Sequence, residues 1–388
     1  MNKTASKESA KRVKRVFHVV THFDVGGAEE VAAGIARSAT PGVEYHIVEI
    51  MRARTAYTRL FKDRMRDAGI ICHRAFMPDI QFHFLFERIA AVCFPLWFVF
   101  VYLRWRPDVI HTHTETPDMS VCLLFTLCPW LKRCRIIRTV HNTRLWTGQP
   151  KLGRRIETFY QRLGANVAIS ESVRESYLRE YGQDLRIIHN GVEPVPQKAW
   201  PELHEGRINV LFAGRIELQK GISRLIDTLR MMAGDDRYFF HIVGDGSLRA
   251  DVEQCVSCLD NATLYPPVYG LSSYLSSFDC LFMPSEFEGL SILSIEASMA
   301  ALPVVANDCP GLGDTLPPDW PLKARNNDMH DYRRIFRDIL PTADLTELGR
   351  QSRLFATRHF GIRRMQEAYE KLYFGVGPQP VAAASNPN

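Results

Sequence analysis

Short apolar runs alternate with longer amphipathic stretches along the first half of the chain. The runs are rich in Val and Ile, which is typical of buried strands. They lie at residues 15–20, 45–50, 108–111, 135–140, 166–169 and 186–189. Helical periodicity marks residues 26–38, which open with two glycines, and residues 173–181. Strands that alternate with helices predict βαβ units and a parallel sheet.

The same alternation starts again after residues 194–206, a segment with three prolines and no apolar period. Further strands are predicted at residues 208–213, 238–243, 263–265, 280–283 and 304–306. Further helices are predicted at residues 221–232, 247–259, 293–300, 331–340, 344–359 and 362–373. The predicted fold class is α/β, with two Rossmann-like doubly wound lobes that face each other across a cleft. Ligands of such sheets bind at the carboxyl ends of the strands.

The length of 388 residues fits two or three domains at roughly 150 residues each. The patterns predict six segments. They are a basic and disordered tail (1–15), a first lobe (16–193), a linker (194–206), a second lobe (207–360), a helix that packs back on the first lobe (361–375) and a disordered tail (376–388). The two lobes are long enough to bury a core each without disulfide bonds.

The formal net charge of +5 is concentrated at the N-terminus. The first fifteen residues carry six basic side chains and one acidic side chain, so the rest of the chain is close to neutral. A neutral body argues against a dedicated nucleic-acid-binding protein. The tail is either a solvated terminus or a segment that contacts an anionic membrane surface. Nine scattered cysteines and no apparent secretory signal favour a cytoplasmic protein.

Residues 89–103 form a charge-free apolar run between Arg88 and Arg104. The run is shorter than a membrane-spanning helix usually is, and Pro95 interrupts it. Two interpretations stay open. The run is either a buried helix of the first lobe or a helix that lies in a membrane interface, with aromatic side chains at the level of the lipid headgroups.

Two carboxylates, Glu288 and Glu296, flank the predicted start of a helix near Ser291. The backbone N–H groups of residues 289–291 open this helix, which favours an anion or a row of hydroxyl groups there. Glu296 lies among apolar residues, where a carboxylate must be hydrogen-bonded, and a ribose diol would provide two such bonds. The competing interpretation is a helix cap with a solvated glutamate.

Two cations, Arg215 and Lys220, follow the strand at residues 208–213. Two cations at the carboxyl end of a strand suit a diphosphate, because Arg can bind two oxygens while Lys acts as a point charge. They could equally be solvated surface groups. The Gly-rich turn at residues 244–249 does not complete a dinucleotide fingerprint, since Arg249 stands at the third glycine position.

These segments resemble glycosyltransferase family 4 from residue 16 to about residue 373. PSEFEGLSILSIEA is similar to the family's Glu-x7-Glu segment, and AGRIELQKGISRLI is similar to its AGR-x4-KG segment. IVGDGSLRADVE, NGVE and GGAEEVA also resemble family segments. The resemblance implies a GT-B fold, with the acceptor bound by the first lobe and a nucleotide-sugar by the second. It also implies transfer with retention of configuration, without a metal or another cofactor.

The resemblance also implies roles for individual residues. Catalytic roles are implied for His113, Arg215, Lys220 and Glu288. Donor-binding roles are implied for Gly26, Gly27, Arg215, Lys220, Gly289, Leu290, Ser291 and Glu296. His141 is a weaker candidate on the acceptor side. His111 and His113 form an HxH pair, but we expect the two rings to point apart, which disfavours a metal site.

One segment departs from the family pattern. Residues 307–315 read NDCPGLGDT, where the family often has two glycines and a glutamate, and Asp314 is a candidate for the place of that glutamate. The EGLS sequence is similar to members that act in exopolysaccharide and lipopolysaccharide synthesis. We therefore expect a cytoplasmic, peripherally membrane-bound enzyme with a saccharide or lipid-linked saccharide acceptor. The alternatives are a non-catalytic nucleotide-sugar-binding protein and another GT-B enzyme, such as a nucleotide-sugar epimerase.

Overall fold

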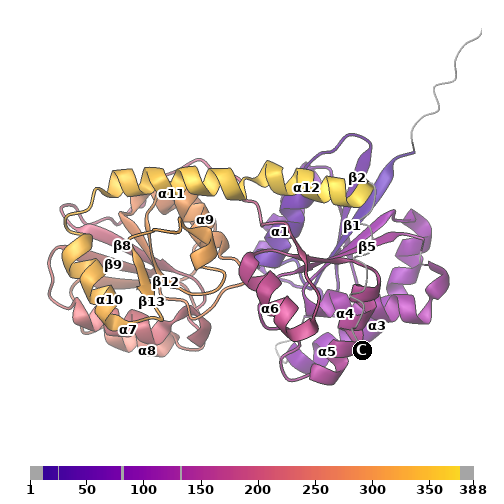
Figure 1. The fold of residues 1–388 in the computed structure, drawn as a ribbon, viewed down its shortest axis with the longest axis horizontal. Coiled ribbons are helices and arrows are strands. Elements are labelled where there is room, and N and C mark those ends of the chain that lie inside the picture. Colours follow the sequence, from indigo (N-terminus) through magenta and orange to yellow (C-terminus); the bar gives the residue numbers. More distant parts are fainter. Residues whose placement is uncertain (1–11, 25, 80–82, 132, 376–388) are drawn as a thin grey trace, which may run out of the picture. The chain divides into compact units, whose positions relative to one another are not determined.

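The computed structural model describes residues 12–24, 26–79, 83–131 and 133–375 (Figure 1). Contacts along the chain divide it into two units, which we describe separately. The first unit comprises residues 1–140, 145–167 and 366–388, and the second comprises residues 141–144 and 168–365. Each unit is built on one parallel sheet, as the alternation of strands and helices predicts.

The first sheet has seven strands in the order β3-β2-β1-β4-β5-β6-β7. Its strands are β1 (Lys14–Val20), β2 (Val43–Glu49), β3 (Ile71–Arg74), β4 (Val109–His113), β5 (Arg135–Val140), β6 (Asn166–Ala168) and β7 (Arg186–Ile187). β1 pairs in parallel with both β2 and β4, so the chain crosses from one side of β1 to the other after β3. This reversal of strand order is the topological feature beside which doubly wound sheets bind ligands.

Helices connect these strands. They are α1 (Gly27–Ala36), α2 (Ala56–Asp67), α3 (His83–Trp105), α4 (Glu115–Leu127), α5 (Pro150–Arg162) and α6 (Glu171–Tyr181), with a single 3-10 turn, η1 (Pro129–Leu131). The final helix, α12 (Ile362–Phe374), contributes its residues from Gln366 onward to the first unit. There the Tyr369 hydroxyl hydrogen-bonds Thr139 on β5 at 2.7 Å, and the Gln366 amide donates to the Gly34 carbonyl of α1.

The second sheet has six strands in the order β10-β9-β8-β11-β12-β13. They are β8 (Ile208–Ala213), β9 (Tyr238–Val243), β10 (Ala262–Tyr265), β11 (Cys280–Met283), β12 (Val304–Asp308) and β13 (Lys323–Arg325). The helices are α7 (Ile222–Met231), α8 (Arg249–Val256), α9 (Ile292–Met299), α10 (Met329–Arg334) and α11 (Leu345–Phe360); the shorter turns are η2 (Leu218–Lys220), η3 (Leu271–Ser277), η4 (Gly313–Thr315) and η5 (Ile335–Ile339). Trp200 of the predicted linker is buried in this unit's core and anchors a segment that is otherwise mostly exposed and has no regular structure.

The predicted basic tail is too long at its C-terminal end. β1 begins at Lys14, and the Arg15 guanidinium donates to Glu44 at 2.8 Å and to the Trp105 carbonyl at 2.9 Å. Lys14 is exposed and Arg15 is partly buried, so both charged side chains fit the start of a strand whose other residues are buried. The remainder of the tail, residues 1–11, and the predicted C-terminal tail, residues 376–388, lie outside the described residues.

The predicted lobe boundary at residue 193 stays a prediction. β6 and β7 are strands of the first sheet, which agrees with a first lobe that ends after them. The contacts nevertheless assign residues 168–193 to the second unit. Strand pairing and overall contact therefore divide this segment differently.

Candidate functional site

The loop after β8 holds Arg215 and Lys220 at the carboxyl end of the second sheet. A 3-10 turn over Leu218–Lys220 leads into α7 through Gly221, which adopts a left-handed conformation with φ +70°. A Cβ atom at Gly221 would lie 1.8 Å from the Pro284 carbonyl oxygen. Glycine is therefore needed for the β8 loop to pack against the loop after β11, and this packing carries Lys220 to that loop.

Lys220 and Glu288 meet directly. The Lys220 Nζ atom donates to Glu288 Oε1 at 2.6 Å, and the Ser285 hydroxyl donates to the same oxygen at 2.9 Å. Glu288 is buried, so the ammonium group compensates a carboxylate that would otherwise be costly to bury. Arg215 is exposed, with its Nη2 atom 3.5 Å from Gln219 Oε1. The structure thus brings two of the predicted catalytic residues into one ion pair and places Arg215 on the same loop.

The segment Gly289–Ser291 is fixed from two sides. A Cβ atom at Gly289 would lie 1.8 Å from the His141 carbonyl oxygen, and the Gly289 carbonyl accepts a hydrogen bond from Ser170 Oγ at 2.8 Å. The Ser291 amide donates to the Gly311 carbonyl at 2.9 Å. The weak acceptor-side candidate His141 therefore contacts the donor-side loop through its backbone.

Ser291 also caps α9, since its hydroxyl accepts a hydrogen bond from the Ser294 amide at 3.3 Å. The capped helix begins at Ile292, so the amides of its first turn lie at the loop that carries Glu288. A helix N-terminus of this kind favours an anion by its dipole and its unpaired amides. Leu290 is buried, so its side chain is not exposed to a ligand.

The departure from the family pattern at residues 307–315 has a structural explanation. The Pro310 carbonyl accepts from the Glu288 amide at 3.0 Å, and a Cβ at Gly311 would lie 2.2 Å from the Glu288 carbonyl oxygen. Pro310 and Gly311 therefore support the Glu288 loop through backbone contacts. The Asp314 carboxylate accepts from Ser172 Oγ at 2.7 Å near the start of α6, so it already has a structural partner.

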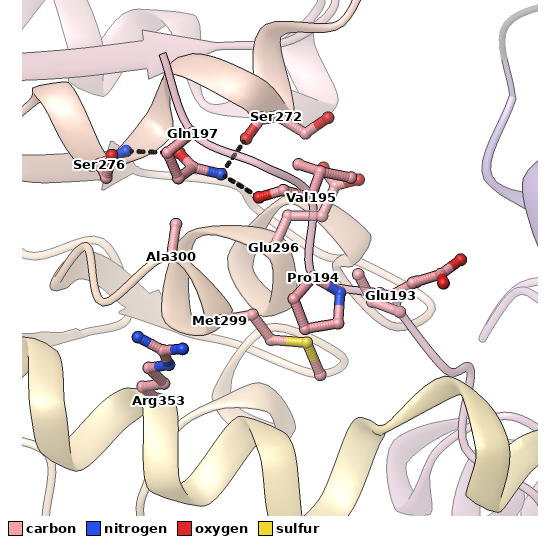
Figure 2. Close-up of a pocket in the computed structure, with 11 residues that line it drawn as sticks. Glu193, Pro194, Val195, Gln197, Ser272, Ser276, Glu296, Met299, Ala300 and Arg353 are labelled. Carbon is pink, nitrogen blue, oxygen red and sulfur yellow. Dashed lines mark hydrogen bonds between the residues drawn. The ribbon is translucent and has the colours of Figure 1, made fainter. Parts of the chain in front are cut away.

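Glu296 lies in the second turn of α9 and lines a cavity of the second unit (Figure 2). The cavity measures about 200 Å³ and is bounded by residues of the linker, η3, α9 and α11. Figure 2 shows the Gln197 side chain at one side of the cavity, where its amide donates hydrogen bonds to the Val195 and Ser272 carbonyls at 3.0 Å each. The linker thus supplies one wall of the cavity that contains Glu296.

His113 is fully buried at the end of β4 in the first unit. Its Nε2 atom lies 3.0 Å from His18 Nδ1, and its ring centroid lies 4.1 Å from that of His111. The expectation that His111 and His113 point apart was wrong, because residues two positions apart in a strand share a face. Burial lowers the pKa of His18 to about 3, so this imidazole is neutral at physiological pH.

This histidine cluster is the place in the described part of the chain where ligand atoms gather closely enough for a metal ion. Atoms of His18, His111 and His113 lie within 4.8 Å of one another. Both ring nitrogens of His111 already bond hydroxyl groups, those of Tyr373 at 2.7 Å and Thr139 at 2.6 Å. A metal would have to displace one of these bonds, so the expectation of a metal-free enzyme stands as a prediction.

Gly26 and Gly27 open α1, also in the first unit. A Cβ at Gly26 would lie 2.1 Å from Glu29 Oε2, so the absence of a side chain leaves room for this carboxylate. Glu29 is buried, and burial raises its pKa to about 7. Sequence reasoning did not select Glu29, although an acidic residue two positions after a Gly-Gly helix start was a visible signal.

Two family models match consecutive parts of the chain. The model for Glycosyltransferase Family 4 matches residues 25–195, and the model for glycosyl transferases group 1 matches residues 207–328. The chain belongs to glycosyltransferase family 4. It is therefore a transferase enzyme, as the Glu-x7-Glu and AGR-x4-KG segments predicted.

Two relatives of this glycosyltransferase extend over most of its length. An uncharacterized protein in the cps region of Klebsiella pneumoniae is 24% identical over 70% of this chain and 82% of its own. The 2-deoxystreptamine glucosyltransferase of Streptomyces kanamyceticus is 28% identical over 67% of this chain and 75% of its own.

The fold agrees with solved structures. Anabaena HepE in complex with UDP and glucose superposes with a TM-score of 0.74 at 15% identity, over 92% of this chain and 98% of HepE. Together with the two parallel-sheet lobes, this similarity confirms the predicted GT-B fold.

Proposed function

We propose that the second unit binds a nucleotide-sugar donor and that the enzyme transfers its sugar with retention of configuration. The observation that carries the proposal is the Lys220–Glu288 ion pair beside the N-terminus of α9. Lys220 and Arg215 bind the donor diphosphate, and the first-turn amides of α9 add donors for its charge. For Gly26 and Gly27 of the first unit, a role toward the donor phosphates is implied by the family resemblance alone.

Donor binding breaks the Lys220–Glu288 ion pair and gives each residue a new partner on the donor. The diphosphate takes over the ammonium group of Lys220, and Glu288 is released to accept hydroxyl groups of the transferred sugar. The Ser285 hydroxyl keeps Glu288 in position, since it bonds the same carboxylate oxygen. Glu296 accepts the two ribose hydroxyl groups. A role of His113 toward the sugar is implied by the family resemblance alone, and it requires that the buried side chain becomes accessible.

The chemical step is stabilisation of the leaving group. The anomeric C–O bond breaks and its electron pair goes to the diphosphate oxygen, where two cations and the helix N-terminus receive the charge. The acceptor hydroxyl attacks from the same face, and its proton passes to the departing diphosphate oxygen. This route needs no carboxylate nucleophile, which leaves Glu288 to bind hydroxyl groups.

The acceptor is a saccharide of a cell-surface polysaccharide, carried on a lipid. The name of the Klebsiella relative places that protein in a cps region, and the EGLS sequence at residues 288–291 is similar to polysaccharide enzymes. UDP in the HepE complex supports a uridine nucleotide as the first donor to test. A lipid-linked acceptor requires the enzyme to work at the inner face of the plasma membrane.

A product screen tests the proposal. The purified chain is incubated with UDP-, GDP- and ADP-sugars and with lipid-linked saccharides, and products are separated by mass. We expect transfer from one nucleotide class and an α-configured product from an α-configured donor. An inverted product would contradict the retaining mechanism, and an absence of both transfer and donor hydrolysis with every donor would contradict the donor assignment.

A further inference from the structure

The outer face of α3 is apolar. Five exposed side chains recur at intervals of three or four residues and so fall on one side of the helix. They are Ile89, Val92, Leu96, Phe100 and Leu103, and we call them the apolar stripe. Leu96 and Phe100 at its centre are 67% and 73% exposed. A surface helix normally presents polar residues on this side, so the stripe implies a further contact.

The opposite face of α3 is held in the first unit. Phe98 is fully buried and meets Phe17 of β1 edge-to-face, with ring centroids 6.2 Å apart. The Tyr102 hydroxyl bonds the Leu131 carbonyl, which attaches the end of α3 to η1. Trp130 in the same turn is also exposed. Figure 1 shows α3 beside α4 in the first unit.

This packing bears on how α3 could contact a membrane. Among the described residues, Phe86–Trp105 is the helix long and apolar enough to cross a membrane by length and composition. A spanning helix would have to leave the sheet and expose the buried side chains around Phe98. A helix in the membrane plane keeps that packing and covers the stripe.

The charges around the stripe are positive. Residues 88–106 contain no acidic side chain, and Arg88, Arg104 and Arg106 are exposed at its two ends. A second copy of the chain on this face would bring these arginines together, which is unfavourable. An anionic lipid surface complements them.

Two basic residues near the N-terminus lie close to the C-terminal end of α3. The Arg15 guanidinium bonds the carbonyl of Trp105, the last residue of α3, and Arg12 pairs with Asp108 at 3.3 Å. The chain therefore enters the described structure beside the C-terminal end of α3. The preceding residues 1–11 carry three lysines and one glutamate.

We propose that α3 lies in the plane of an anionic membrane, with the apolar stripe in the lipid and its flanking arginines at the headgroups. The inference rests on the proposed function only for its purpose, which is to hold the enzyme where a lipid-linked acceptor is found. Its test needs neither donor nor acceptor, so the docking surface and the transfer reaction can fail separately.

Vesicle co-sedimentation of the full chain is the test. Phosphatidylcholine vesicles are compared with vesicles that also contain phosphatidylglycerol. We expect binding to the anionic vesicles only, and we expect added salt to weaken it. Each basic residue removed near the surface, as in Arg104→Gln, should lower the vesicle affinity by about fivefold. Removal of residues 1–11, which leaves β1 intact, should weaken binding further.

The variant Leu96→Glu/Phe100→Glu should lose at least about tenfold in vesicle affinity, because two apolar side chains no longer enter the lipid. Leu354→Glu is the matched control, since Leu354 is 58% exposed on α11. It should bind vesicles like the wild type, and all variants should keep the wild-type thermal unfolding. Failure of the wild type to bind anionic vesicles would overturn the proposal. Wild-type vesicle affinity in the Leu96→Glu/Phe100→Glu variant would also overturn it. A wild type that self-associates through the apolar stripe and does not bind vesicles would instead identify a second copy of the chain as the occupant, and would overturn it too.

Discussion

Lys220 and Glu288 compensate each other in the ligand-free enzyme, and this has a consequence for binding. The Lys220 Nζ atom lies 2.6 Å from Glu288 Oε1, and both side chains are largely shielded from solvent. A diphosphate that binds the Lys220 ammonium group must offset the loss of the ion pair with Glu288. The gain is that both groups are already positioned, since the Ser285 hydroxyl and the Gly221–Pro284 packing hold them in place. Such preorganisation is the main source of electrostatic catalysis.

Glu29 should make the stability of the first unit depend on pH. Burial raises the pKa of Glu29 from an ordinary 4.5 to about 7. Between these two pH values, Glu29 is therefore protonated in the folded state and ionised in the unfolded state. Stability should therefore fall as pH rises from about 4.5 to about 7. Urea unfolding at pH 5 and pH 8 measures this, and Glu29→Gln should show a smaller loss than the wild type. Exposed Glu253 provides the control Glu253→Gln, and identical losses in all three proteins would contradict the assignment.

The histidine cluster makes the metal-free prediction testable. If His18, His111 and His113 serve as neutral packing groups, transfer activity should survive excess EDTA at an unchanged rate. Elemental analysis of the purified enzyme should find less than one bound transition metal per chain. Loss of activity that returns with added Zn²⁺ or Mn²⁺ would count against the prediction and would point to the cluster.

At the scale of elements, strands such as β9 and β11 were predictable because all of their side chains are buried, which gives nearly continuous apolar runs. Helix α2 was not predicted, because the apolar side chains that it buries, Phe61 and Met65, lie in a stretch dominated by charged residues. Its start depends on a capping box between Thr55 and Thr58. β3 was missed because its four side chains are only partly buried. The Glu-x7-Glu segment predicted a loop and a helix start correctly, but it could not show the backbone support from Pro310 and Gly311.

Gly221 offers a prediction about the contact between two loops. Gly221→Ala should lower the free energy of unfolding by more than the ~1–2 kcal/mol expected for a left-handed alanine, because its Cβ also meets the Pro284 carbonyl. It should also weaken donor binding by moving Lys220. Gly234→Ala is a matched control, since Gly234 has φ +72° with open space around it. Equal effects of the two substitutions on unfolding and donor binding would refute the loop-contact explanation.

At the scale of the molecule, the sequence predicted the family and the two parallel sheets, but not the ion pair between Lys220 and Glu288. Arg215, Lys220 and Glu288 could be placed because each follows a strand of the same sheet. The roles of Gly26, Gly27 and His113 toward the donor remain proposals, since these residues belong to the first unit. Their position in the sequence carries no information on how close they come to a bound sugar.

The proposed mechanism depends on the binding of the donor diphosphate by Lys220. Calorimetric titration of UDP, or of the nucleotide selected by the product screen, into wild-type enzyme and Lys220→Ala tests it most directly. Lys323→Ala is the control, because Lys323 pairs with Asp308 in the same unit. One lost charge-assisted bond is worth about 1.5–3 kcal/mol, so Lys220→Ala should weaken nucleotide binding by about tenfold to a hundredfold, with Lys323→Ala unchanged. Wild-type affinity in a folded Lys220→Ala enzyme would contradict this role of Lys220.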